Sequence, residues 1–338
     1  MTVTAIDQES PIMSEGSTMR AIAHEEYGID ALELRKVDKP VLEDHQLLIR
    51  VHASSVNPAE YYGVTGPTFA RLFGGGLRRP KGATVGADLA GRVEAVGKDV
   101  TEFQPGDEVF GSSGASWAEY APAREVRLVR KPANISFEEA AAVPIAAITA
   151  LQALRDKGQV EPGQKVLING ASGGVGTYAV QLAKAFGADV TAVCSTGNVD
   201  LVRSLGADHV IDYTTTDFTR TEKRYGVILD NVEAQPLADV RRALTPTGTL
   251  IPNSGRGGRW LGPLGRIVKA RVLSGFTRQQ LKPLVSVAKR QDLLTLADLL
   301  ATGQVTPVID RTYPLEQIVD AHRYVETGKK TGNVVVGV

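Results

Sequence analysis

The chain has 338 residues with a single cysteine, and its 38 lysine and arginine residues balance 38 aspartate and glutamate residues. The absence of net charge argues against nucleic acid as the main partner. The lone Cys194 excludes an intramolecular disulfide and a cysteine-built structural zinc site. No run of 18 apolar residues is present that would span a membrane. We therefore expect a cytoplasmic protein, long enough for two domains.

The first part of the chain, residues 19–135, alternates short apolar segments with Gly, Pro and Asp. Gln46–His52 and Ala90–Gly97 show the alternation of half-buried strands, and Gln104–Phe110 is typical of a turn that enters a strand. The pattern predicts a compact antiparallel β domain, preceded by a disordered tail over residues 1–18.

A helical stretch follows over Ser136–Lys157, with Ser136 and Glu139 at the spacing of a capping box. We expect this helix to bridge the first domain and a second domain that covers residues 136–278.

The second domain begins with a strand, a glycine-rich turn and an amphipathic helix over Val175–Phe186. Ala171, Gly173 and Gly176 fit a dinucleotide-binding fingerprint in which alanine replaces the first glycine. Gly173 is expected to let the backbone approach a pyrophosphate, and Gly176 to let the helix lie close to the strand. The N–H groups at the helix start would face the phosphates.

The strand and helix alternation continues beyond this turn, which favours a doubly wound parallel sheet buried on both faces. Predicted helices lie at Asn198–Leu205, where Gly206 ends the helix, and at Pro236–Leu244. The predicted strands are residues 166–168, 189–195, 209–213, 226–232, 248–254 and 271–276. A doubly wound domain that binds another nucleotide, or none, is the alternative.

After residue 278 the parallel rhythm ends. A helix is predicted around Asp292–Ala301, then the segment Val305–Asp310 and a closing strand at Asn333–Val338. Residues 279–338 are expected to return to the first domain, so that the dinucleotide domain is inserted between its two parts.

From Met19 to Val338 the chain resembles the medium-chain dehydrogenase/reductase superfamily, in its zinc-free quinone oxidoreductase-like branch. The motifs that carry the resemblance are Ser55–Pro58, Val85–Gly91, Pro105–Val109, Ala141–Leu151, the glycine turn, Leu205–Asp208 and Gly328–Val336. The resemblance implies an α/β protein in which a GroES-like, β-rich catalytic domain packs against a Rossmann domain, with the active site in the cleft between them.

Zinc-dependent relatives carry a cysteine near the position of Asn57 and a Gly-His-Glu motif where this chain has Gly86, Ala87 and Asp88. Asp88 and Glu60 alone would make a poor zinc site, and no two of the five histidines stand at ligand spacing. The sequence therefore predicts no metal. Without a metal to polarise an oxygen, a reactive acceptor such as a quinone or an α,β-unsaturated carbonyl compound is favoured.

The cofactor is predicted to be NADPH, because the end of the second strand lacks the acidic residue that holds the ribose of NAD. Ser195, Thr196 and Asn198 would accept a 2′-phosphate there, and the resemblance adds Tyr213. Gly197 stands where a basic residue is expected, so Lys329 or Lys330 would supply the charge, unless both lie in a solvated turn. The predicted cofactor-binding set is Ala171, Ser172, Gly173, Gly174, Val175, Gly176, Ser195, Thr196, Asn198, Tyr213, Asn231, Lys330 and Asn333.

The resemblance places three candidate catalytic residues near the nicotinamide: Asn57, Tyr62 and Thr149. The Tyr62 phenol would donate a hydrogen bond to the acceptor's oxygen. Neighbouring Tyr61 could do the same, and ordinary aromatic packing is the alternative for Tyr62. The alternative for Thr149 is a hydrogen bond from its hydroxyl to its own helix backbone.

Two basic segments, residues 71–81 and 255–271, are either flaps over the cleft or solvated loops, and Trp260 and Leu264 would give the second one an apolar wall. The leading hypothesis is an NADPH-dependent reductase of a small, hydrophobic, electrophilic substrate, with a homodimer left open. The alternatives are a non-catalytic NADPH-binding redox sensor and a metal-free alcohol or carbonyl dehydrogenase.

Overall fold

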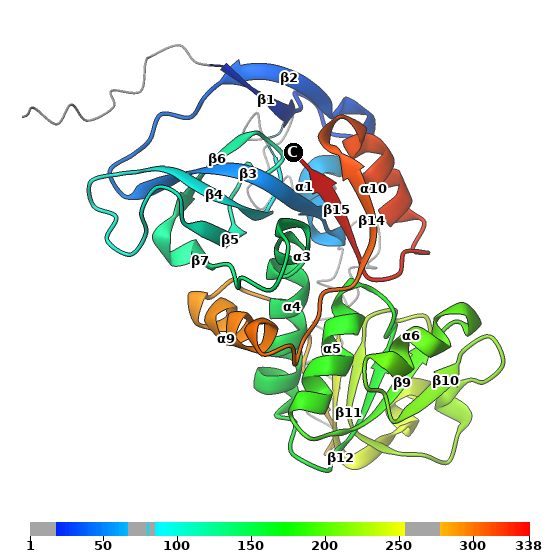
Figure 1. The fold of residues 1–338 in the computed structure, drawn as a ribbon. Helices are drawn as coiled ribbons and strands as arrows, with labels where there is room; N and C mark the ends of the chain where they lie inside the picture. The colour runs from blue at the N-terminus through cyan, green and yellow to red at the C-terminus, as the bar shows by residue number, and fades with distance from the viewer. Residues whose placement is uncertain (1–17, 67–79, 81–84, 254–277) are drawn as a thin grey trace, which may run out of the picture.

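The computed structural model describes residues 18–66, 80, 85–253 and 278–338, and for Tyr62 it describes the backbone alone. Two β-rich regions stand at opposite ends of the molecule, with the helices α4 Pro144–Leu151 and α9 Arg290–Ala301 between them (Figure 1). The strands of the first region are β1 Thr18–Ala23, β2 Glu33–Asp38, β3 Gln46–Val56, β4 Asp88–Val96, β5 Glu108–Ser112, β6 Tyr120–Arg124, β7 Leu128–Arg130, β14 Ile309–Pro314 and β15 Asn333–Gly337. Its helices are η1 Ile29–Ala31, α1 Pro58–Thr65, η3 Glu125–Arg127, η7 Leu315–Gln317 and α10 Ile318–Glu326.

The main sheet of this region has the order β14-β15-β3-β4-β5-β7, and β6 also pairs with β3. Most pairs are antiparallel, but β14 and β15 run parallel. The last strand, β15, lies antiparallel to β3, with Val335 opposite Ser55. The C-terminal strands therefore complete a sheet begun by the first part of the chain, which the red and blue arrows show side by side (Figure 1).

The second region contains a six-stranded parallel sheet with helices around it. Its strands are β8 Lys165–Asn169, β9 Asp189–Cys194, β10 His209–Asp212, β11 Tyr225–Asp230, β12 Leu244–Pro252 and β13 Gln280–Leu281. Its helices are α5 Gly174–Ala185, η5 Thr196–Asn198, α6 Val199–Ser204, η6 Phe218–Arg220 and α7 Leu237–Arg242.

The strand order of this sheet is β10-β9-β8-β11-β12-β13, which is the 3-2-1-4-5-6 order of doubly wound dinucleotide-binding domains. The order reverses between β8 and β11, and ligands of such sheets bind beside that reversal, at the carboxyl ends of the strands. The predicted α/β fold with a parallel sheet is therefore confirmed. The predicted sixth strand at 271–276 falls outside the described residues, and the sixth described strand is β13.

The predicted helical stretch over Ser136–Lys157 is helical in the structure, where it divides into three parts. These are α3 Phe137–Ala141, α4 Pro144–Leu151 and the π-helical segment η4 Gln152–Gly158. Proline has no N–H and clashes with the preceding turn, so Pro144 ends one helix and opens the next. The Ser136 and Glu139 capping box is present as predicted.

The largest cluster of buried apolar residues runs through both regions. It joins Ala53 and Phe110 of the first sheet to α4, and α4 to Val166 and Leu229 of the parallel sheet. Because α4 is buried along most of its length, its position relative to both sheets is fixed by packing. No helix in the described ranges has the length and hydropathy that crossing a bilayer would need.

Candidate active site

The glycine-rich turn connects β8 to α5 at the point where the strand order reverses. Gly170 has a φ of +74°, which few other residues adopt. A Cβ at Gly176 would lie 2.1 Å from the Gly170 carbonyl oxygen, so the close approach of α5 to β8 requires glycine there. A Cβ at Gly173 would meet only that same oxygen, at 3.5 Å. The protein itself therefore leaves space in front of Gly173, at the start of a 12-residue helix, where a phosphate would fit.

The C-terminal segment from the other sheet passes over the start of α5. The Gly332 N–H donates to the Ser172 carbonyl oxygen at 2.7 Å. A Cβ at Gly174 would lie 2.7 Å from Asn333 Oδ1 and 3.0 Å from Lys330 Nζ, so both polar groups converge on the first turn of the helix. The glycine-rich turn and the segment that leads into the C-terminal strand therefore lie together at one site.

Lys330 is the cation of this site. Its Nζ donates to the Gly332 carbonyl oxygen at 2.7 Å. Burial lowers the pKa of Lys330 to about 8, although nearby Asp310 acts in the opposite direction. Asp310 Oδ2 accepts from the Thr331 N–H at 2.9 Å and from the Tyr324 hydroxyl at 2.7 Å. A partly buried ammonium beside a helix N-terminus is a suitable counter-charge for a bound phosphate.

The end of β9 carries the residues predicted to hold a 2′-phosphate. Asn198 Nδ2 donates to Ser172 Oγ at 3.1 Å and to Ser195 Oγ at 3.3 Å, and Asn198 Oδ1 accepts from the Thr331 hydroxyl at 3.1 Å. Asn198 therefore joins the glycine turn, the end of β9 and the C-terminal segment. Tyr213 lies beside them, because its N–H donates to the Cys194 carbonyl oxygen at 3.0 Å, and its side chain is exposed.

The predicted acid-free end of β9 has an acid beside it. Thr196 Oγ1 donates to Asp212 Oδ2 at 2.6 Å, and Asp212 is the last residue of the neighbouring strand β10. The sequence pattern around β9 did not reveal this carboxylate, since it is supplied by another strand. The sequence could have indicated it, because Asp212 directly precedes the predicted phosphate ligand Tyr213 and β10 is the neighbour of β9.

Asparagines follow or end three adjacent strands at the same edge. Asn231 Nδ2 donates to the Asn169 carbonyl oxygen at 3.2 Å, and Asn253 Nδ2 donates to Asn231 Oδ1 at 2.8 Å. Asn169 Nδ2 donates to Asp230 Oδ1 at 2.8 Å. Asn231 thus lies beside the reversal of strand order, and Asn253 is a further polar residue at this edge that the sequence analysis did not name.

A cavity of about 730 Å³ reaches from the end of β12 to the first sheet. Asn253, Ile145, Thr149 and Asp88 are among the residues that line it. Thr149 Oγ1 donates to the Ile145 carbonyl oxygen of its own helix at 2.6 Å. The hydroxyl hydrogen is therefore used inside α4, and toward a ligand Thr149 can act only as an acceptor.

Asn57 is not among the residues that line this cavity, but it belongs to a buried network that reaches the cavity through Asp88. Asn57 Nδ2 donates to Ser55 Oγ at 2.7 Å and to Asp88 Oδ2 at 2.9 Å. Asp88 also accepts from Ser55 Oγ at 2.8 Å and from the Ile145 N–H at 3.1 Å. Asp88 thereby connects β4 to the first turn of α4. Because both hydrogens of the Asn57 amide are engaged, its oxygen is the free polar group.

Two carboxyl groups of this network have raised pKa values. Burial raises the pKa of Asp88 to about 7, against the hydrogen bonds from Ser55, Asn57 and Ile145. Burial, followed by the charge of Asp88, raises the pKa of Glu60 to about 8. The Glu60 oxygens accept from the Asn57 and Ala87 N–H groups at 2.7 Å each.

The oxygens of these carboxyl groups accept hydrogen bonds from N–H and O–H donors. In the described ranges, no group of three or more His, Cys, Asp or Glu side chains could hold a metal ion. A zinc ion does not fit this donor set.

Several sequence predictions concern residues outside the described set. The backbone of Tyr62 lies in α1, but the structure does not describe its side chain. The basic segments, with Trp260 and Leu264, lie outside the described residues, apart from Pro80.

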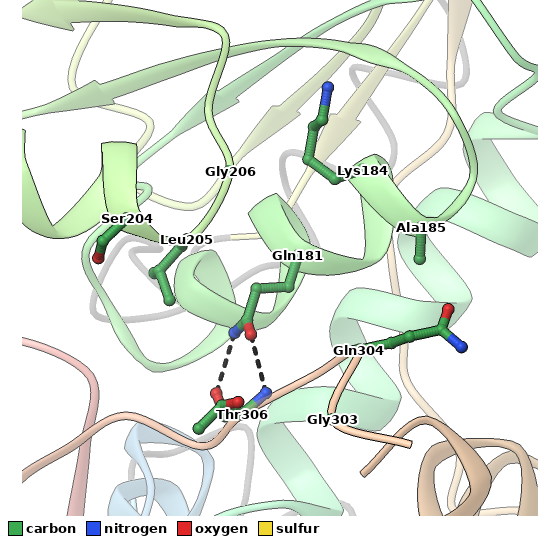
Figure 2. Close-up of a pocket in the computed structure, with 9 residues that line it drawn as sticks. All are labelled: Gln181, Lys184, Ala185, Ser204, Leu205, Gly206, Gly303, Gln304 and Thr306. Atoms are coloured by element: carbon green, nitrogen blue, oxygen red, sulfur yellow. Dashed lines mark hydrogen bonds between the residues drawn. The ribbon is translucent and has the colours of Figure 1, made fainter.

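A second hollow, of about 420 Å³, lies beside the C-terminal half of α5 and contains none of the predicted site residues (Figure 2). Gln181 exchanges two hydrogen bonds with the backbone of Thr306 there, at 3.0 and 2.8 Å. These bonds fasten the returning chain to α5.

Comparisons with known proteins give consistent matches along the chain. Residues 43–134 match the family model "Alcohol dehydrogenase GroES-like domain", and residues 205–336 match "Zinc-binding dehydrogenase". A chloroplast envelope quinone oxidoreductase homolog of Arabidopsis thaliana is 32% identical, over 95% of this chain and 99% of that protein. A 2-methylene-furan-3-one reductase of Solanum lycopersicum is 33% identical, over 98% of this chain and 82% of that protein. The structure of a quinone oxidoreductase from Coxiella burnetii has a TM-score of 0.84 and 30% identity, covering 95% of this chain and all of that one.

Proposed function

Because the chain belongs to the quinone oxidoreductase-like branch of the medium-chain dehydrogenase/reductase superfamily, we propose that it transfers hydride from NADPH to a quinone or an α,β-unsaturated carbonyl compound without a metal. The chain is an oxidoreductase with a GroES-like domain and an NAD(P)-binding Rossmann domain. The choice of NADPH, the absence of zinc and the roles of individual residues are parts of the proposal.

The observation that carries the proposal is the cavity between α4, the end of β12 and the first sheet. Its buried carboxyl group, Asp88, already accepts hydrogen bonds from Ser55, Asn57 and Ile145, which supports a structural role for this carboxyl group rather than metal binding. A conjugated acceptor needs less electrophilic assistance than an alcohol or a simple carbonyl compound, because the incoming charge delocalises. The names of the Arabidopsis and Solanum relatives, a quinone oxidoreductase homolog and a methylene-furanone reductase, support the same acceptor class.

The proposed cofactor site consists of the glycine turn, the C-terminal segment and the end of β9. A nicotinamide cofactor, when bound, supplies the hydride. The N–H groups at the start of α5 and the Lys330 ammonium would hold the pyrophosphate, while Ser195 and Tyr213 would receive the adenosine end. Asn333 and Asn231 would lie beside the bound cofactor. Gly173 leaves the space that the cofactor requires.

Within the cavity the chain's own residues would orient the reactants and stabilise charge. Thr149 would accept a hydrogen bond from an amide N–H, since its own hydrogen is engaged in α4. Asn57 would offer its oxygen in the same way. We propose the Tyr62 phenol as the donor to the acceptor's oxygen as negative charge builds there, and Tyr61 as the alternative donor.

The proposal is tested by measuring NADPH and NADH oxidation against a panel of quinones, enals, enones and simple ketones, with the metal content of the same sample determined. Steady oxidation of NADPH with conjugated acceptors, unchanged by chelators, is expected. A protein that binds NADPH but reduces none of them would act as a non-catalytic sensor. One tightly held zinc per chain, lost together with activity, would refute the metal-free mechanism.

The proposal includes the cytoplasm as the site of action, whereas the name of the Arabidopsis relative places that protein at the chloroplast envelope. Cell fractionation distinguishes the two. A homodimer is also part of the proposal, and light scattering on the purified protein tests it.

A further inference from the structure

The carboxylate of Asp212 lies beside the end of β9. Thr196 lies twenty residues beyond Gly176, where NAD-binding sheets carry an acid at the end of the second strand. Here the acid comes from the adjacent strand. Asp212 pairs in register with Cys194 across β10 and β9, and its Oδ2 accepts from the Thr196 hydroxyl at 2.6 Å.

The position of Asp212 is fixed by its own turn. Its Oδ1 accepts from the Thr214 N–H at 2.9 Å and from the Thr214 hydroxyl at 2.7 Å. The hydrogen bonds from Thr196 and Thr214 lower the pKa of Asp212, so the group is ionised at neutral pH. Within the described ranges no ion pair neutralises it, and Arg203 of the nearby helix α6 pairs instead with Asp200, at 3.6 Å.

The hydrogen bonds in this region also occupy donor groups that a 2′-phosphate would need. The Thr196 hydroxyl gives its hydrogen to Asp212, so only its lone pairs are left for a ligand. Asn198 Nδ2 is directed at Ser172 and Ser195. Of the residues predicted to bind the phosphate, Ser195 and Tyr213 keep a free hydroxyl hydrogen, and neither carries a positive charge.

We propose that Asp212 is a specificity-determining residue that opposes the 2′-phosphate of NADPH and thereby allows NADH to bind as a competing cofactor. This inference rests on the proposed function. The Asp212 carboxylate would act by repelling the 2′-phosphate, since both groups are negative, and by orienting the Thr196 hydroxyl. The 2′-hydroxyl on the adenosine ribose of NADH carries no charge and can donate a hydrogen bond to the Asp212 carboxylate or the Thr196 oxygen.

The test compares the dissociation constants of NADPH and NADH for the wild type and two variants, measured by fluorescence titration in 20 mM and 500 mM salt. Asp212→Asn keeps the turn-forming oxygen, removes the charge and frees the Thr196 hydrogen. It should tighten NADPH binding roughly three- to tenfold and leave NADH binding within about twofold, since two like charges near the surface repel each other only modestly in water. The gain should shrink at high salt, because exposed charges are screened.

Asp217→Asn is the matched control. Asp217 Oδ1 accepts from the Thr219 N–H at 2.9 Å and the Thr219 hydroxyl at 2.8 Å, the same turn that Asp212 makes. This control should alter neither dissociation constant. Asp212→Ser, which retains a turn-forming oxygen without charge, replaces Asp212→Asn if that variant melts at a lower temperature than the wild type.

Selective tightening of NADPH in either folded Asp212 variant supports the inference. An unchanged ratio of the two dissociation constants in both variants, with both cofactors bound, overturns it while the proposed function stands. A wild-type protein that binds neither cofactor refutes the proposed function, and the inference with it.

Discussion

Two glycines of the same turn should fail in different ways when each is replaced by alanine. A Cβ at Gly176 would lie 2.1 Å from the Gly170 carbonyl oxygen and 2.7 Å from the Ala171 carbonyl carbon. Both are backbone atoms, so the turn itself would have to move. A Cβ at Gly173 meets one atom, at 3.5 Å, an ordinary van der Waals distance. Gly176→Ala should therefore damage the fold, and Gly173→Ala the ligand site alone.

The expected magnitudes follow from these contacts. Overpacking against a backbone that cannot relax should cost Gly176→Ala about 3 kcal/mol of unfolding free energy or more. Gly173 precedes α5 with a φ of −81° and a ψ of 176°, which alanine adopts freely, so its substitution should change stability by less than about 1 kcal/mol. Its affinity for NADPH should fall roughly ten- to a hundredfold, because a charge-assisted hydrogen bond to phosphate is worth about 1.5–3 kcal/mol.

Circular dichroism melting and NADPH fluorescence titration measure the two effects separately. Gly337→Ala, at the end of β15, is the control, since a Cβ there has no neighbour within 4 Å among the described residues. A Gly173→Ala protein with wild-type affinity would contradict the placement of the pyrophosphate. An equal fall in melting temperature in the Gly173 and Gly176 variants would contradict the claim that only a Cβ at Gly176 clashes with the backbone.

Three further predictions concern single side chains. Burial lowers the pKa of Lys330 to about 8, so the affinity of the wild type for NADPH should fall as pH rises through that value. Lys330→Gln should bind NADPH about tenfold more weakly, and its affinity should not change over this pH range. A pH profile shared by both proteins would exclude Lys330 from phosphate binding. Burial and the charge of Asp88 raise the pKa of Glu60 to about 8 from 4.5, so the folded chain retains a proton that the unfolded chain releases between these values. The free energy of unfolding should therefore fall as pH rises from 5 to 8, by on the order of a few kcal/mol, and Glu60→Gln should flatten that slope in urea titrations; an identical slope would place the titrating group elsewhere. Tyr62→Phe should lower kcat/KM for enones roughly ten- to a thousandfold, with a smaller loss for quinones, and wild-type efficiency on every acceptor would leave Tyr62 a packing residue.

The parallel sheet was predictable from sequence because its signals are local. Apolar runs such as Val166–Ile168 have no polar alternation, which identifies strands buried on both faces. Glycine positions fixed the first turn, and the Gly206 signal ended α6 where the pattern predicts. The bridging segment is helical as the sequence indicates, but its division at Pro144 was not predicted.

The site was less predictable because its contacts join residues far apart in the chain. The Asp212 carboxylate reaches Thr196 only through the pairing of β10 with β9. Lys330 reaches α5 only because β15 joins the first sheet and Gly332 bonds Ser172. The family resemblance could name Asn57 and Thr149, but it could not show that their N–H and O–H hydrogens are engaged within the protein.

The central claim, direct hydride transfer from NADPH to a conjugated acceptor without a metal, is tested most directly by isotope transfer. Protein treated with a chelator and shown to be metal-free would be incubated with NADPH deuterated at C4 of the nicotinamide and with an enone. One deuterium at the β-carbon of the saturated product, in a protein that keeps its full rate, is the predicted result. Product without deuterium, or a rate that returns only when zinc is added, would contradict the claim.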